Sequence, residues 1–460
     1  MKSYHQDDRN LIPLALAAIR AWEKRWQPFE AHVASAVEPE RLQRAWDEYV
    51  RLLGLNAPFF HPRYAGQMLK PPHPAAMLGY LAAMLINPNN HAADGGAATG
   101  EMEREVVREI AGMFRFPDDA LGHLTSGGTL ANTEALWVSR ELRPSAAVAY
   151  SDQSHYTHER MCGVLGIQGI KIASNAHGEM DLDALETALQ GGNIGTVVVT
   201  AGTTGVGAVD PIDRVLELRD RYGFRVHVDA AYGGFFTLLA WGDSTLLPVA
   251  RFRAIAQCDS VVVDPHKHGL QPYGCGCVIF RDPAVAAFYK HDSPYTYFTS
   301  DTEHLGEISL ECSRPGAAAG ALWLTLRCLP LAAGNGLGPM LEACLRAARN
   351  WSGLLAANPG LNEFVSPTLD IVTYFPGKPR SVGAIDEAST RLFDLAMRSS
   401  DPVYLSLLRV GAQQLRERYP ALASDAPQCR ILRSVLMKPE HEHAVEGIHQ
   451  RLLELLNTPD

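Results

Sequence analysis

The chain has 460 residues, too many for one simple hydrophobic core, so we expect two or three domains that share an interface. Its 47% hydrophobic and 20% charged residues are ordinary for a globular protein, and its net charge of −10 argues against broad binding to nucleic acid or anionic lipid. The polar start and the lack of an apolar run of about 20 residues argue against a signal peptide and a membrane span. The scattered cysteines lack metal-ligand spacing, so we predict no metal site and a reduced, cytoplasmic protein.

Residues 1–75 form the first predicted segment, and it is mostly helical. The stretch 11–26 places four large apolar side chains at roughly helical spacing, namely Leu14, Ile19, Trp22 and Trp26. A helix this apolar should pack on something else. The proline-rich residues 71–74 then mark a boundary.

Residues 76–335 alternate between short apolar strands and helical stretches such as 213–223. The predicted strands are 146–150, 196–200, 225–229, 260–264 and 277–280. Continuous apolar strands that alternate with helices indicate a mostly parallel sheet covered on both faces. We therefore predict an α/β fold with a large domain over this range.

Residues 336–460 have a different character. A helical stretch at 340–355 is followed by short strands at 370–375 and 430–437. This mixture predicts a smaller α+β domain at the C-terminal end.

Polar side chains gather where the predicted strands end. In a parallel sheet, ligands bind beyond the carboxyl ends of the strands. A glycine-rich turn at 123–136 also leads into a helix. The strand-end residues are Asp229, Asp264 with Lys267 just beyond it, His155, Thr203 and Thr204.

Each of these features alone has an ordinary structural explanation, such as a helix cap for an Asp or a solvent-reaching Lys. The whole set matches the needs of one cofactor, pyridoxal phosphate. The amine of Lys267 can form a Schiff base with its aldehyde, and a buried carboxylate can keep its pyridine nitrogen protonated. A helix start with small residues can bind its phosphate through backbone N–H groups.

Five motifs in this order resemble the group II pyridoxal-phosphate-dependent amino acid decarboxylases, such as the aromatic-L-amino-acid and tyrosine decarboxylases. They are HLTSGGTLANTEALW, SDQSHYTHER, AGTTGVGAVDPI, HVDAAYGG and DPHKHG. The resemblance runs from HPRYAG (61–66) to LRSVLMKP (432–439). It implies the type I fold of pyridoxal enzymes, an obligate homodimer in which residues 1–75 help to dimerise, and an active site at the subunit interface.

By position, the resemblance makes Lys267 the Schiff-base lysine, Asp229 the partner of the pyridine nitrogen and His155 the residue stacked on the ring. Thr204 would contact the cofactor, with the adjacent Thr203 as an alternative. The phosphate would be bound by Gly127, Gly128 and Thr129, with His266 close by. Asp264 has no assigned role, because a carboxylate near a phosphate is unfavourable unless it points away or is hydrogen-bonded.

The resemblance also implies a tyrosine that protonates the α-carbon after carbon dioxide leaves. It lies on a loop after the lysine strand, and residues 290–301 match that loop. Tyr295 fits the spacing best, and Tyr297 is the alternative.

The resemblance implies that residues 56–66 form part of the pocket for the substrate side chain, and their composition does not decide between two classes of amino acid. Phe59, Phe60 and Tyr64 would favour an aromatic amino acid such as tyrosine, DOPA or tryptophan, whereas Arg63 would favour aspartate or glutamate. The aromatic excess favours an aromatic substrate. A carbon–carbon lyase on the same fold is a further alternative, and a non-catalytic relative is disfavoured because Lys267, Asp229 and His155 occur together.

Overall fold

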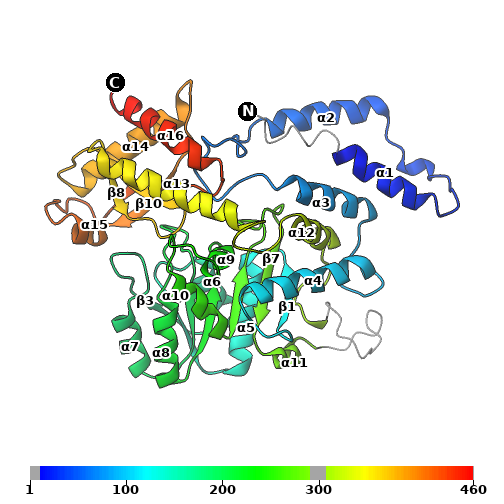
Figure 1. Ribbon diagram of the computed structural model, residues 1–460, viewed down its shortest axis with the longest axis horizontal. Helices are drawn as coiled ribbons and strands as arrows, with labels where there is room; N and C mark the ends of the chain where they lie inside the picture. The colour runs from blue at the N-terminus through cyan, green and yellow to red at the C-terminus, as the bar shows by residue number, and fades with distance from the viewer. Residues whose placement is uncertain (1–10, 291–306, 459–460) are drawn as a thin grey trace.

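The computed structural model describes residues 11–290 and 307–458, and a seven-stranded sheet lies at its centre (Figure 1). The strand order across the sheet is β1-β7-β6-β5-β4-β2-β3. The strands are β1 Leu121–Thr125, β2 Ala147–Ser151, β3 Gly169–Ile172, β4 Ile194–Thr200, β5 Arg225–Asp229, β6 Ser260–Val263 and β7 Gly276–Phe280.

Within the run β6-β5-β4-β2-β3 every pair of adjacent strands is parallel, and β7 runs antiparallel to both β6 and β1. The predicted mostly parallel sheet is thereby confirmed. All five strands predicted for this domain are present, to within a few residues at their ends. The sheet also contains β1 and β3, which the sequence did not predict.

Alternate residues of each strand pack into separate cores on the two faces of the sheet, because successive side chains point in opposite directions. On one face, residues such as Val197, Val226 and Val261 pack under helices α4 Ala97–Met113, α7 Leu182–Gln190, α8 Ile212–Tyr222 and α10 Val249–Ala254. On the other face, Val198 and Val262 pack under α5 Gly128–Leu142, α6 Thr157–Leu165 and α11 Ala286–Tyr289. This two-sided burial explains why the strands are apolar throughout.

A second, antiparallel sheet of order β10-β11-β9-β8 forms the small α+β unit predicted near the C-terminus, drawn in yellow to red in Figure 1. Trp351, Leu392 and Leu452 join it to its helices in one core. The elements are β8 Leu361–Val365, β9 Ile371–Pro376, β10 Ser406–Gly411, β11 Gln428–Val435, α13 Gly338–Ala357, α14 Val382–Arg398, α15 Ala412–Arg418 and α16 His441–Leu456.

The N-terminal helices α1 Leu11–Glu23 and α2 Pro39–Leu53 lie at the outer edge of the molecule in Figure 1. Helix α1 packs against α3 Pro74–Ile86, which in turn packs on α12 Gly316–Cys328. Helix α2 keeps an apolar stripe exposed, formed by Leu42, Trp46, Tyr49, Val50 and Leu53. The predicted domain boundaries at residues 75 and 335 stay predictions. Among the described residues, no helix has both the length and the apolar character needed to cross a bilayer.

Candidate functional site

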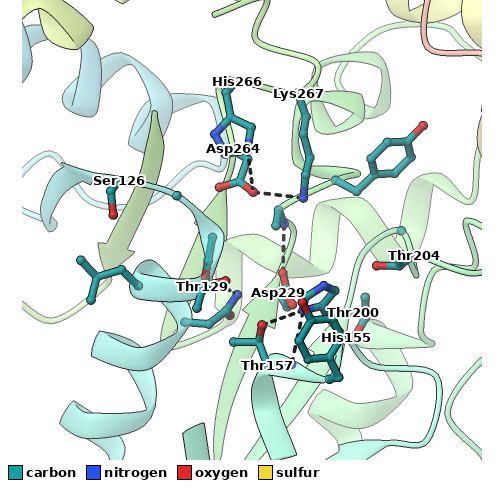
Figure 2. A pocket seen from close by; sticks show the side chains of 18 residues that line it. Ser126, Thr129, His155, Thr157, Thr200, Thr204, Asp229, Asp264, His266 and Lys267 are labelled. Atoms are coloured by element: carbon teal, nitrogen blue, oxygen red, sulfur yellow. Dashed lines mark hydrogen bonds and ion pairs between the residues drawn. The ribbon is translucent and has the colours of Figure 1, made fainter. Parts of the chain in front are cut away.

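A cavity of about 380 Å³ opens at the carboxyl ends of β4, β5 and β6 (Figure 2). Its wall is built from the turn before α5, the start of α6 and the loops that follow these three strands. This volume lies within the range of about 300 to 1,000 Å³ that is usual for small-molecule sites. The position agrees with the rule that ligands of parallel sheets bind beyond the strand ends.

The cavity brings together residues that are up to 140 positions apart in the sequence. The described residues that we predicted for the site, all of which line it, are Gly127, Gly128, Thr129, His155, Thr204, Asp229, His266 and Lys267. Asp264 lines it as well. Tyr295 and Tyr297 lie outside the described residues.

Lys267 reaches into the cavity from the turn that follows β6, where its ammonium meets a carboxylate. Its Nζ lies 3.0 Å from Oδ2 of Asp264. The same carboxylate oxygen lies 3.5 Å from Nε2 of His266. Asp264 thus balances the charge of the lysine, which gives this carboxylate the partner that the sequence alone did not indicate.

Asp229 ends β5, and its carboxylate is held by two donors. Its Oδ2 lies 2.8 Å from Nε2 of His158, and its Oδ1 accepts a hydrogen bond from the backbone N–H of Ala231 at 3.1 Å. Burial alone raises the pKa of Asp229, but the hydrogen bond from His158 and the charges of His158 and Lys267 outweigh it and hold the pKa below its usual range. The cavity therefore has a buried, ionised carboxylate at its base.

His227 lies two residues before Asp229 on the same strand and supports it from below. Its Nδ1 lies 2.8 Å from Oγ of Ser260, and its Nε2 lies 2.9 Å from Oδ1 of Asn132. Burial lowers the pKa of His227 to about 3, so the ring is neutral at physiological pH. These bonds join β5 to β6 and α5, and they fix the end of β5.

The imidazole of His155 lies beside Asp229 in Figure 2, at the start of α6. Its Nδ1 lies 2.7 Å from Oγ1 of Thr157, which fixes the ring orientation. Burial lowers the pKa of His155, and the nearby Asp229 opposes this shift only in part. A neutral, fixed ring of this kind is suited to lie flat against an aromatic ligand.

The turn before α5 needs its glycines. Gly127 has φ of +153°, a conformation that other residues rarely adopt. A Cβ on Gly128 would lie 2.7 Å from Oδ2 of Asp264, and a Cβ on Gly276 of β7 would lie 2.6 Å from Cα of Gly127. Close approach of β7 and Asp264 therefore requires small residues at the N-terminus of α5, where backbone N–H groups and the helix dipole attract an anion.

The groups around this turn fit a bound phosphate. Nδ1 of His266 is buried beside the cavity and has no hydrogen-bond partner among the described residues, so it can serve a ligand oxygen. Of the two threonines after β4, Thr204 lines the cavity. Thr203 instead accepts the backbone N–H of Ala208 on its Oγ1 at 3.0 Å.

The residues expected to form a side-chain pocket do not line this cavity within one chain. Arg63 forms an ion pair with Asp401, and Tyr64 packs edge-on against Phe59 with ring centroids 4.9 Å apart. Phe60 lines a different cavity. In the described part of the chain, no arginine lines the cavity and Lys267 is its one lysine.

Sequence reasoning missed three polar residues that shape the site. His158 holds Asp229, Asn132 holds His227, and Tyr232 lines the cavity while its hydroxyl donates to Oδ1 of Asp370 at 2.7 Å. For His158, the sequence held a usable signal: it lies three residues after His155, at the start of α6, so both side chains can face the same site. Within residues 11–290 and 307–458, no group of three or more His, Cys, Asp or Glu side chains is placed to hold a metal ion.

Known proteins resemble this chain in both sequence and structure. The family model described as "Pyridoxal-dependent decarboxylase conserved domain" matches residues 33–366. The L-tyrosine decarboxylase of Enterococcus faecium is 29% identical over 390 residues, which cover 64% of this chain and 64% of the relative. The L-aspartate decarboxylase of Thermococcus kodakarensis is 28% identical over 314 residues, which cover 67% of this chain and 78% of the relative.

Among solved structures, Oryza sativa TDC with PLP and tryptamine matches with a TM-score of 0.78 and 19% identity. The match covers 99% of this chain and all of the other, and it shows a shared fold. The chain spans just under two thirds of the length of the first relatives that it matches in sequence.

Proposed function

Because the chain belongs to the family of pyridoxal-dependent decarboxylases, we propose that it decarboxylates an L-amino acid to the amine and carbon dioxide with pyridoxal phosphate. The observation that carries the proposal is the placement of Lys267 and the ionised Asp229 in the wall of one cavity (Figure 2). An amine and a buried carboxylate in this arrangement are the two groups that this cofactor requires.

When bound, pyridoxal phosphate accepts the electron pair that the departing carboxyl group leaves behind. Lys267 would hold the cofactor's aldehyde carbon, and Asp229 would keep a proton on the pyridine nitrogen. His158 keeps Asp229 ionised and directs it into the cavity through the 2.8 Å contact. His155 would cover one face of the ring, and Thr204 would contact it.

The phosphate would lie at the N-terminus of α5, on the backbone of Gly127, Gly128 and Thr129, with Nδ1 of His266 as a further donor. The negative charge of Asp264 is compensated as long as the amine of Lys267 or another hydrogen-bond donor lies next to the carboxylate. We propose Tyr295 as the group that protonates the α-carbon, with Tyr297 as the alternative, on the basis of the sequence.

We propose an aromatic substrate such as tyrosine, DOPA or tryptophan. Tyr156, Tyr232 and His155 contribute aromatic wall to the cavity, and its described wall offers no arginine to an acidic side chain. The tyrosine decarboxylase among the relatives supports the same choice. Aspartate or glutamate is the alternative, which the L-aspartate decarboxylase among the relatives supports.

We also propose a homodimer with a shared active site. The exposed apolar stripe of α2 supports it, because such stripes mark protein interfaces. Residues 59–64 do not line the cavity of Lys267 within one chain. In a dimer, the partner chain would complete the pocket for the substrate side chain. A cytoplasmic location stays a prediction from the sequence.

The test incubates purified protein and pyridoxal phosphate with tyrosine, DOPA, tryptophan, aspartate and glutamate, and identifies the amines by mass spectrometry. We expect an aromatic amine as the main product, and none from Lys267→Ala. Borohydride should fix the cofactor to the peptide that contains Lys267. Formation of β-alanine or γ-aminobutyrate as the main product would favour the acidic alternative, and cofactor fixed to Lys70, Lys171, Lys290 or Lys438 would contradict the site.

A further inference from the structure

A second cavity, of about 250 Å³, lies where the segment before α3 meets the turn after Lys267 and the start of α16. Its polar wall includes Lys70, Lys438 and Glu440, and its apolar wall includes Phe60, Leu270 and Met340. None of the residues that line this cavity lines the cavity of Lys267. It is therefore a separate site, and it belongs to no step of the proposed reaction.

The two lysines of this cavity have few partners. Lys438 is 3% exposed, and its Nζ donates to the backbone oxygen of Tyr64 at 2.6 Å. Nζ of Lys70 donates to the backbone oxygen of Met437 at 3.2 Å. Each ammonium has three N–H donors, so each has donors left over. In the described part of the chain, neither lysine forms an ion pair with a carboxylate within 4 Å.

Two enclosed ammonium groups without a counter-ion are costly, because burial in a low dielectric disfavours the charged form. Burial lowers the pKa of Lys70, and burial together with the charge of Lys70 lowers the pKa of Lys438 to about 7. The carboxylates nearby are Glu440, which lines the cavity, and Asp370. Asp370 does not line the cavity and accepts a hydrogen bond from Tyr232, so Glu440 is the one carboxylate in the described wall beside the two lysines.

We propose that this second cavity binds a small carboxylate with an apolar body. The carboxylate would lie between Lys70 and Lys438, and the body would pack against Phe60, Leu270 and Met340. With about 30 Å³ for each water in the liquid, a cavity of about 250 Å³ has room for roughly eight waters, or for a small organic molecule in their place. An aryl- or alkyl-carboxylic acid matches this size and this division of the wall.

The site is connected to the lysine turn by the backbone. Leu270 lies three residues after Lys267, and its N–H donates to the oxygen of Lys267 at 3.4 Å. Its own oxygen accepts the N–H of His73 at 3.0 Å, and its φ is +65°, a conformation that a leucine rarely adopts. A ligand that packs on Leu270 would therefore contact the turn that places Lys267.

Competitive labelling of lysines tests the proposal on the natural protein with its cofactor. Trace acetic anhydride is applied across a pH series, and peptide mapping gives the labelling rate of each lysine. The probe is 3-phenylpropionate, and 3-phenylpropan-1-ol is its uncharged counterpart. We expect 3-phenylpropionate to protect Lys438 and Lys70 saturably, with at least a threefold fall in the labelling of Lys438 at pH 7. The exposed Lys171 is the internal control and should not change.

Variants separate the role of each group. In Lys70→Met, the protection of Lys438 by 3-phenylpropionate should weaken about tenfold in concentration. Glu440→Gln is the matched variant with the opposite expected effect. It removes a negative charge from the cavity wall, so 3-phenylpropionate should bind more tightly. Equal protection by 3-phenylpropan-1-ol or by inorganic phosphate, unchanged protection in Lys70→Met, or no protection in the natural protein would each overturn the proposal. The readout does not depend on decarboxylation, so its failure would leave the proposed function untouched.

Discussion

At the scale of single residues, the charge of Asp229 matters more than its shape. We expect Asp229→Asn to keep the hydrogen bond to His158 and the fold, but to lose turnover by several kcal/mol of transition-state stabilisation, on the order of that of a buried charged hydrogen bond. Steady-state kinetics with the best amino acid measures the loss, and circular dichroism checks the fold. Asp220→Asn, an exposed change on α8, is the control. Near-normal turnover with cofactor bound would mean that another group holds the ring.

A second residue-scale prediction concerns the proton donor proposed from the sequence. Tyr295→Phe removes one phenolic hydroxyl, so it should still bind the substrate but form amine about 100- to 10,000-fold more slowly, as is typical when a general acid is lost. Mass spectrometry of the products should show carbonyl by-products as the amine falls. Tyr297→Phe is the matched control, and loss of amine there instead would transfer the role to Tyr297.

At the scale of elements, the close approach of β7 to the glycine turn determines the shape of the proposed phosphate site. A Cβ on Gly276 would lie 2.6 Å from both the Cα of Gly127 and the Oγ1 of Thr125. Gly276→Ala must therefore displace the backbone that we propose for phosphate binding. We expect at least tenfold weaker binding of pyridoxal phosphate, measured by fluorescence titration. Gly353→Ala in α13, where a Cβ meets nothing within 4 Å, should bind the cofactor normally.

The exposed stripe of α2 gives a second prediction at this scale. Trp46 lies at the centre of the stripe and is 56% exposed, and a glutamate there would place a charge in the proposed dimer interface. We expect Trp46→Glu to yield monomers with little activity, as measured by light scattering coupled to size exclusion. Leu142→Glu, at an exposed apolar residue on α5, should leave the assembly unchanged. A dimeric Trp46→Glu protein would place the interface elsewhere.

At the scale of the whole molecule, buried neutral histidines make stability depend on pH. Burial lowers the pKa of His227 and of His441 to about 3, below the usual value of about 6.5. The unfolded chain therefore binds more protons than the folded chain between these values, and stability falls as the pH is lowered from about 6.5 towards 3. Urea unfolding at pH 4 to 7 should show this slope, with a shallower one in His227→Gln. His443→Gln, at an exposed histidine, should keep the original slope.

The sequence predicted those parts of the fold that have a local pattern. Both faces of β6 are buried, so the run Ser260–Val263 is mostly apolar, and this pattern made the strand predictable from the sequence. Strand β3 is short, half-exposed and contains a lysine, so no pattern distinguished it from a loop. The second domain was visible through the change of character near residue 340, although β8 and β10 were not predicted.

The candidate site was predicted through residues that follow strands, because the topology brings strand ends together. The contacts that set the charges were not predictable. The pairing of Lys267 with Asp264 depends on the turn geometry after β6, and the pairing of His158 with Asp229 joins residues 71 positions apart. The expected pocket residues Phe59 to Tyr64 were placed by resemblance, and the fold of one chain directs them elsewhere.

The contacts of Asp370 have a consequence for synthesis on the ribosome. This acid directly precedes β9 in the small domain, yet it accepts a hydrogen bond from the hydroxyl of Tyr232 and lies 3.2 Å from Nε2 of His268, the neighbour of Lys267. All three side chains are buried. A nascent chain that ends before residue 370 therefore lacks the carboxylate that Tyr232 and His268 contact. Until Asp370 is added, its large domain holds these two polar side chains without that partner. Lys267 emerges from the ribosome about a hundred residues before Asp370, so we expect the surroundings of its neighbour His268 to be complete only after the start of β9 has been made.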